Sequence, residues 1–64
     1  MKRGDLLLPN EYQRRNKSHV SGIILGRSLI HRHEWEVYLS NGIIKDIRED
    51  VMHDLFVIVE FQER

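Results

Sequence analysis

The chain has 64 residues, no cysteine, and ten cationic side chains against ten carboxylates. A chain of this length forms one domain, residues 1–64. It buries only about 60% of the surface that its unfolded form exposes, so its stability alone is marginal. The lack of cysteine excludes disulfides and thiolate metal sites. Zero net charge argues against a protein devoted to non-specific nucleic-acid binding.

The charges are unevenly distributed along the chain. Residues 1–32 carry seven cations and two carboxylates, whereas residues 33–64 carry three cations and eight carboxylates. The two halves therefore have net charges of +5 and −5. Such an asymmetry can steer association, or the charges simply solvate the surface if folding mixes the halves.

The sequence also indicates where the protein resides. No apolar run approaches the roughly 20 residues that span a membrane. The three leucines before Pro9 are too few for the core of a signal peptide. The lack of cysteine is consistent with an intracellular protein. We therefore expect a cytoplasmic protein without a membrane partner.

The first predicted strand covers residues 5–8 and contains the apolar run Leu6-Leu7-Leu8. Because proline cannot donate to a ladder, this strand either ends at Pro9 or lies at an edge of the sheet. Residues 10–19 follow. They are polar, lack helical periodicity and carry three cations, so they predict a long exposed loop. Long loops in small domains are often functional.

The middle of the chain predicts three more strands. β-Branched residues between glycines indicate a second strand at residues 20–26, which can extend to residue 30, and Gly26 predicts a bulge or bend in it. Apolar and polar residues alternate over 33–40, the pattern of a half-buried strand. Asn41-Gly42 predicts a type I′ turn, after which residues 43–47 return as the second strand of a hairpin.

The last part of the chain predicts one helical turn and one strand. Residues 48–55 are polar and predict a single 3₁₀ turn, residues 56–61 a strand, and residues 62–64 a fraying tail. Because successive strands are neighbours in sequence, an antiparallel meander is expected. Closing so small a sheet hides its edges. We therefore expect an all-β fold, a five-stranded antiparallel barrel.

This order of elements resembles the small SH3-like barrels, especially those of the Tudor and KOW types. The resemblance rests on Gly4-Asp5-Leu6, Gly22-Ile23-Ile24, residues 35–42 and Glu49-Asp50-Val51. In composition the chain also resembles stand-alone barrels of unknown function that bacteriophages encode. The resemblance implies a binding module or a part of a larger assembly, in the host cytoplasm or in a virion.

The chain has more apolar residues than the core of a small barrel needs. The predicted core comprises Leu6, Leu8, Ile23, Leu25, Trp35, Val37, Leu39, Ile44, Ile47, Leu55, Val57 and Val59. We expect the remaining apolar strand residues, Leu7, Ile24, Phe56 and Ile58, to point outward. Either strongly bent strands bury this surplus, or it forms a surface for another protein or for a second copy of the chain.

Neither a metal site nor a catalytic site is predicted, and no cofactor is expected. His31 and His33 have a spacing that suits zinc, but the sequence fixes no third ligand. We expect both at a strand entrance, half exposed, where they can add pH sensitivity near neutrality. Glu34 and Glu36 share a strand face that should be solvated, unlike a catalytic pair. The sequence contains no phosphate-binding loop or nucleophile elbow.

The sequence therefore predicts a non-enzymatic protein-interaction or assembly module from a phage or a bacterium. Its partner is another protein or a second copy of the chain. The alternative is a barrel that binds RNA or single-stranded nucleic acid through cations of residues 14–17 and stacking tyrosines. The predicted partner-binding residues are Tyr12, Arg14, Arg15, Lys17, Tyr38, Phe56 and Ile58.

Overall fold

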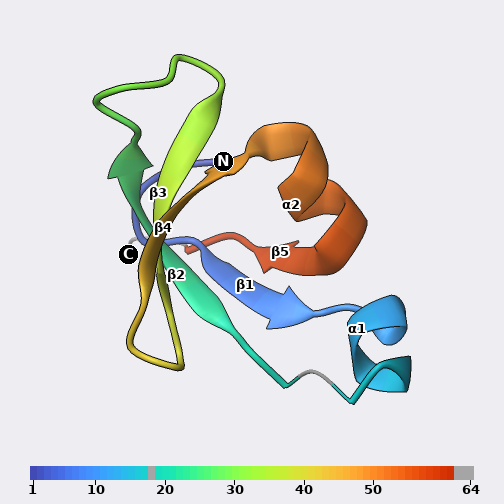
Figure 1. Cartoon of the computed structure of the whole chain (residues 1–64). Helices are drawn as coiled ribbons and strands as arrows, with labels where there is room; N and C mark the ends of the chain where they lie inside the picture. Colours follow the sequence, from blue (N-terminus) through green and yellow to red (C-terminus); the bar gives the residue numbers. More distant parts are fainter. Residues whose placement is uncertain (18, 62–64) are drawn as a thin grey trace.

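The computed structural model describes residues 1–17 and 19–61 and is predominantly β. Its strands are β1 (Leu6–Pro9), β2 (Gly22–Arg27), β3 (Glu34–Leu39), β4 (Ile44–Arg48) and β5 (Phe56–Val59), and its helices are α1 (Glu11–Arg15) and α2 (Glu49–Leu55). The strands form one antiparallel sheet in the order β4-β3-β2-β1-β5 (Figure 1). The predicted five-stranded antiparallel sheet is confirmed. In the described part of the chain, however, no pairing joins the edge strands β4 and β5, so the sheet is not closed.

The predicted β3–β4 hairpin is confirmed, but its turn is of another type. The Leu39 N–H donates to the Ile43 carbonyl at 2.8 Å, which leaves three residues in the loop. Gly42 has a φ of 87°, whereas Asn41 lacks the positive φ that a type I′ turn requires. The loop is therefore a three-residue turn with glycine in the left-handed position.

β2 carries the bulge that Gly26 predicts, because its register against β3 shifts between Ile24 and Gly26. At its other end, Gly22 lies opposite Leu39. A Cβ atom on Gly22 would come within 2.9 Å of Val37 Cγ1 and 3.1 Å of Leu39 Cδ2. Glycine at this position therefore makes room for two β3 side chains of the core.

The segment predicted as a loop contains α1. Asn10 caps this helix by accepting a hydrogen bond from the Gln13 N–H at 3.0 Å. None of the residues of α1 is buried, so its sequence has no apolar periodicity from which a helix can be predicted. Ser18 of the predicted loop and the predicted tail at residues 62–64 lie outside the described residues.

The prediction of a single 3₁₀ turn is wrong, because α2 is an α-helix of seven residues. Its first turn contains Glu49 and Asp50, whose charges suit a helix N-terminus. Met52 of this helix is fully buried in the core. Burial of Met52, together with the packing of Leu55 against the core, thus stabilises a short helix with four polar residues among its seven.

The core lies on one side of the sheet and comprises Leu7, Ile24, Trp35, Val37, Leu39, Met52 and Phe56. The prediction of which alternate residues of a strand face the core, which we call its phase, is confirmed for β3. The phase predicted for β1, β2 and β5 is wrong: Leu7, Ile24 and Phe56 are buried and Ile58 is half-buried, although all four were expected to face outward. Of the predicted core, Leu6, Leu8, Leu25, Ile44, Val57 and Val59 are exposed, and Ile23, Ile47 and Leu55 are half-buried.

A buried carboxylate explains the phase of β1. Asp5 is fully buried and stands two residues before Leu7, so both side chains point to the same face. Its Oδ1 accepts a hydrogen bond from the Phe61 N–H at 3.0 Å, and its Oδ2 accepts one from the Lys2 N–H at 2.9 Å. A buried charge needs such partners, and the partners fix Asp5, and with it Leu7, on the inner side.

Candidate docking surface

The outer side of the sheet carries a row of apolar side chains that crosses all five strands. The strand register places Ile44 opposite Tyr38, Tyr38 opposite Ile23, Ile23 opposite Leu6, and Leu6 opposite Val59. Directly opposite residues point to the same face of a sheet. These five side chains, which we call the apolar row, are therefore neighbours. In β1, β2 and β3 core residues alternate with members of the apolar row, which therefore faces away from the core.

A second apolar pair broadens the row. Leu8 lies opposite Val57 on the same face, and we call the apolar row together with this pair the outer patch. Six of its seven side chains are 40–58% exposed, namely Leu6, Leu8, Tyr38, Ile44, Val57 and Val59. Together they expose on the order of 500 Å² of mostly apolar area, near the top of the range of about 300–600 Å² for the largest, often functional, patch of a typical monomer.

Two carboxylates border the outer patch on β3 and β4. Glu36 lies directly opposite Asp46, two residues before Tyr38 of the apolar row. Like charges in this position destabilise a strand pair. The Ser28 hydroxyl donates to Asp46 Oδ2 at 2.9 Å. Within residues 1–17 and 19–61, however, neither carboxylate forms an ion pair. This acidic pair is therefore an unbalanced negative charge at the rim of the outer patch.

α1 and the residues just after it present the predicted basic residues. The side chains of Tyr12, Arg14, Arg15 and Lys17 are all exposed. Arg15 Nη2 lies 2.7 Å from Glu11 Oε1, which balances one of the three cations. α1 follows β1 and contacts it, whereas the predicted stacking residue Tyr38 lies on β3, with β2 between the two strands. The structure thus gathers the basic residues with Tyr12 and leaves Tyr38 in the outer patch.

The remaining predicted partner-binding residues are not on the outer side. Phe56 belongs to the core, and Ile58 is half-buried against it. Tyr38 is the one predicted binding residue within the outer patch. The sequence prediction missed the other six because it placed them in the core. No local signal in the sequence could have found them, because the inward direction of Asp5, which sets the alternation of β1, depends on its contact with the distant Phe61.

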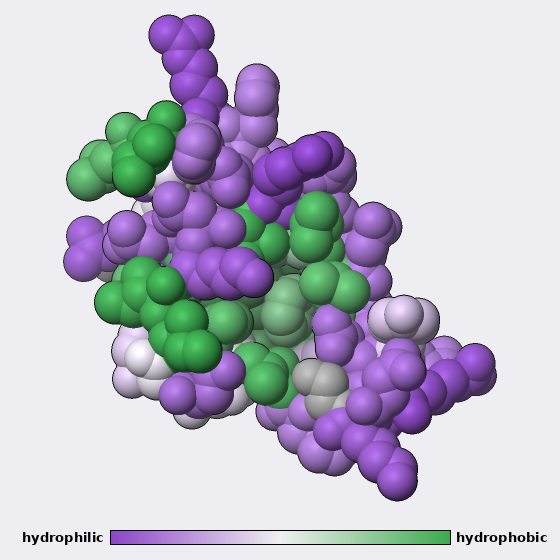
Figure 2. All heavy atoms as spheres, in the orientation of Figure 1, coloured by the Kyte–Doolittle hydropathy of each residue, from purple (hydrophilic) through white to green (hydrophobic). Residues whose placement is uncertain are grey.

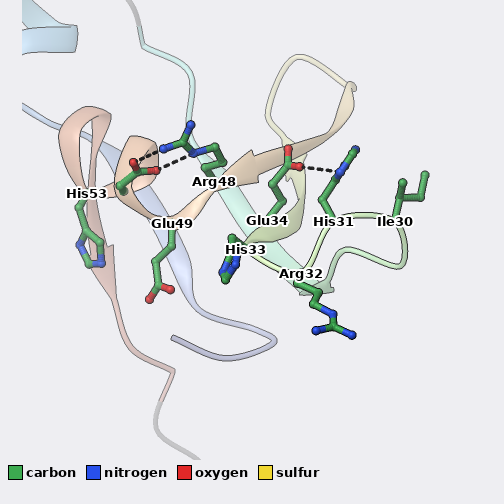
Figure 3. A pocket seen from close by; sticks show the side chains of 9 residues that line it. Ile30, His31, Arg32, His33, Glu34, Arg48, Glu49 and His53 are labelled. Carbon is green, nitrogen blue, oxygen red and sulfur yellow. Dashed lines mark hydrogen bonds and ion pairs between the residues drawn. The ribbon is translucent and has the colours of Figure 1, made fainter.

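Three histidines line an open pocket between the loop before β3 and the start of α2 (Figure 3). His31 Nδ1 lies 3.4 Å from Glu34 Oε2. The Glu49 N–H donates to the His33 carbonyl at 3.3 Å, which joins the loop to α2. His31 and His33 lie at the entrance of β3, as expected, and both are exposed, the His31 side chain by 59%. In the described ranges, no group of three or more His, Asp or Glu side chains could hold a metal ion.

A smaller apolar surface lies where the sheet is open. Figure 2 shows apolar side chains gathered between β4 and α2, with polar side chains around them. Ile47, Val51 and Leu55 line a shallow groove here. Two of them, Ile47 and Leu55, pack against the core. The groove is therefore the margin of the core rather than a separate surface.

Comparison with known proteins adds no relative: no family model, no curated protein and no solved structure matches the chain. Among the helices of residues 1–17 and 19–61, none is long and apolar enough to cross a membrane.

Proposed function

We propose that this protein is a non-enzymatic docking module of the small-barrel type, which binds another polypeptide chain through the outer patch. The observation that carries the proposal is the apolar row, because it extends across every strand of the sheet and four of its five side chains remain exposed. The strand order and the helix between β4 and β5 are compatible with the resemblance to SH3-like barrels.

Docking would bury apolar strand faces, and the flanking charges would select the partner. An interface made by the outer patch alone would bury about 1,000 Å² in total, below the range of about 1,200–2,000 Å² for stable specific complexes. We therefore expect reversible binding. Charges at the rim of such an interface affect association rate and orientation more than affinity.

The test compares two double variants with the same change in charge. Leu6→Lys with Val57→Lys places cations in the outer patch. Leu29→Lys with Ile30→Lys places them at residues that are 97% and 79% exposed, in the loop between β2 and β3. Each protein is immobilised and exposed to a lysate of the cells in which it is naturally made. The bound polypeptide chains, including further copies of the protein itself, are quantified by mass spectrometry.

We expect the wild type and the Leu29/Ile30 variant to retain the same bound chain and the Leu6/Val57 variant to lose it. Equal retention by all three proteins would show that docking does not use the outer patch. Circular dichroism of both variants checks that the fold is kept.

A further inference from the structure

We infer that the occupant of the outer patch is a second copy of this chain, related by a two-fold axis that brings α1 of each copy against the acidic pair of the other. This inference rests on the proposed docking function and names its partner. The area, the charges and the geometry of the outer patch each favour this occupant.

The area of the patch suits pairing with a copy of itself. The outer patch alone contributes on the order of 500 Å² per copy, so two copies would bury about 1,000 Å² before any contribution from the rim, which is the lower limit for a biological interface. The apolar row crosses all five strands, and its members on β1, β3, β4 and β5 are exposed. A closed two-fold contact uses the same surface on both copies, and each apolar row would cover the other.

The charges beside the patch are complementary between copies. The acidic pair, Glu36 and Asp46, forms no ion pair in residues 1–17 and 19–61, and neither do Arg14 and Lys17. In the described part of the chain, two carboxylates without an ion pair therefore lie at the rim of the outer patch, and two cations without one lie in or just after α1, the helix that follows β1. Its net charge is zero, so two copies approach without overall repulsion.

The topology places these opposite charges at opposite ends of the outer patch. β1 and β3 are both antiparallel to β2 and therefore run in the same direction. In that direction Glu36 precedes the apolar row, whereas α1 follows the end of β1 and projects beyond it (Figure 1). We place the two-fold axis in the interface, perpendicular to the line from the acidic pair to α1. Rotation about this axis brings α1 of each copy over the acidic pair of the other copy.

The test uses two charge-reversed proteins. One carries Arg14→Glu with Lys17→Glu, and the other carries Glu36→Lys with Asp46→Lys. In a homodimer of either reversed protein, α1 of each copy would meet residues 36 and 46 of the other copy with like charges. In a heterodimer formed from an equal mixture, both of these contacts would again join opposite charges. Glu36→Gln with Asp46→Asn serves as a milder variant that removes the acidic charges without reversing them.

The measurement is the solution mass by light scattering, from micromolar to near-millimolar concentration and at low salt. We expect the wild type to approach twice the 7.7 kDa of one chain. We expect each reversed protein to remain at the monomer mass, with a dimerisation constant weakened at least about tenfold, and the equal mixture to regain the dimer mass. The milder variant should dimerise more weakly than the wild type.

A wild type that is monomeric throughout would overturn the inference, and so would a dimer whose mass neither reversal changes. Reversed proteins that do not combine when mixed would overturn the two-fold arrangement. The proposed docking function is tested separately from the identity of its partner. If the wild type is monomeric but captures a foreign chain through the outer patch, only the second copy is refuted as the occupant.

Discussion

The Asp5 carboxylate accepts a hydrogen bond from the Phe61 N–H at 3.0 Å, across 56 residues of sequence. Its other oxygen accepts a hydrogen bond from the Lys2 N–H at 2.9 Å. A fully buried side chain thus joins the start of β1 to the segment that follows β5. The same side chain sets the alternation that turns Leu6 and Leu8 outward, so the stability of the sheet and the formation of the outer patch share one cause.

Replacement of Asp5 should destabilise the fold. Asp5→Ala would leave both N–H donors without their acceptors, and Asp5→Asn would place an amide N–H₂ against one of them. We expect both variants to lower the midpoint of urea unfolding, the alanine variant at least as much as the asparagine one. Asp54→Asn, at an exposed position, is the control and should change the midpoint little. Equal midpoints for all four proteins would contradict the role of Asp5.

The stability of the wild type should fall in acid. The Phe61 N–H, followed by the N–H and ammonium groups of Lys2, lowers the pKa of Asp5 below its ordinary value of 3.8 despite the burial. A lowered pKa in the folded state stabilises the fold at pH values above 3.8, and this contribution disappears as the pH falls through the lower pKa. Unfolding measured between neutral pH and strong acid should show the loss.

The Asp5→Asn variant should show a smaller decrease over the same acid range. Asp50 is a useful comparison, because the Arg48 side chain lowers the pKa of Asp50 as well, but at an exposed position. Solvent screens such a pair, so Asp50→Asn should keep most of the acid dependence of the wild type. The opposite ranking of the two variants would contradict this assignment.

Gly22→Ala should destabilise the protein by about 1–3 kcal/mol, the usual cost of overpacking a core. The new methyl group would meet Val37 Cγ1 at 2.9 Å and the Tyr38 carbonyl at 3.2 Å. The double variant Gly22→Ala with Val37→Ala should lose less stability than the sum of the two single variants, because the smaller side chain makes room. Additive losses in the urea unfolding of these three variants would contradict the close packing.

Met52→Ala should cost about 2–5 kcal/mol, because it empties a buried site in the core. Met52 is 0% exposed, whereas its neighbour Val51 on α2 is 37% exposed. Val51→Ala is therefore the matched control and should cost much less. Thermal unfolding followed by circular dichroism separates the two. Similar losses would show that α2 does not contribute to the core through Met52.

Nucleic-acid binding by α1 makes a different prediction about salt. Cations that contact phosphates release counterions, so the affinity for single-stranded RNA or DNA would fall steeply as salt rises. We expect only weak binding in a fluorescence titration at low salt, lost in Arg14→Glu with Lys17→Glu. Binding that stays tight in physiological salt and requires Tyr12 would favour the nucleic-acid alternative over docking through the outer patch.

The sequence predicts best those elements whose signals are local. The alternation of residues 33–40 and the Asn41-Gly42 pair placed the hairpin and its buried face correctly. The phase of β1, β2 and β5 was not predictable in this way, because Leu6-Leu7-Leu8 is apolar at every position and either phase buries leucines. Tertiary contacts decide the phase: the distant Phe61, together with the nearby Lys2, holds Asp5 inside, and Gly22 admits the β3 side chains.

The candidate site was predictable only in part, for the same reason. Tyr38 alternates with Val37 and Leu39, and its exposure follows from the strand pattern. Its apolar neighbours Leu6 and Ile23 come from runs in which the sequence does not distinguish core from surface. The row that they form exists only through the pairing of β1 with β2 and of β2 with β3.

Amide NMR spectra of the wild type at micromolar and near-millimolar concentrations test the central claim most directly. If a second copy covers the outer patch, dilution will shift the signals of Leu6, Leu8, Ile23, Tyr38, Val57 and Val59, together with those of α1 and the acidic pair. The signals of Leu29 and Ile30 will not move. Signals that are unchanged everywhere, or that move only in the groove between β4 and α2, would contradict the account.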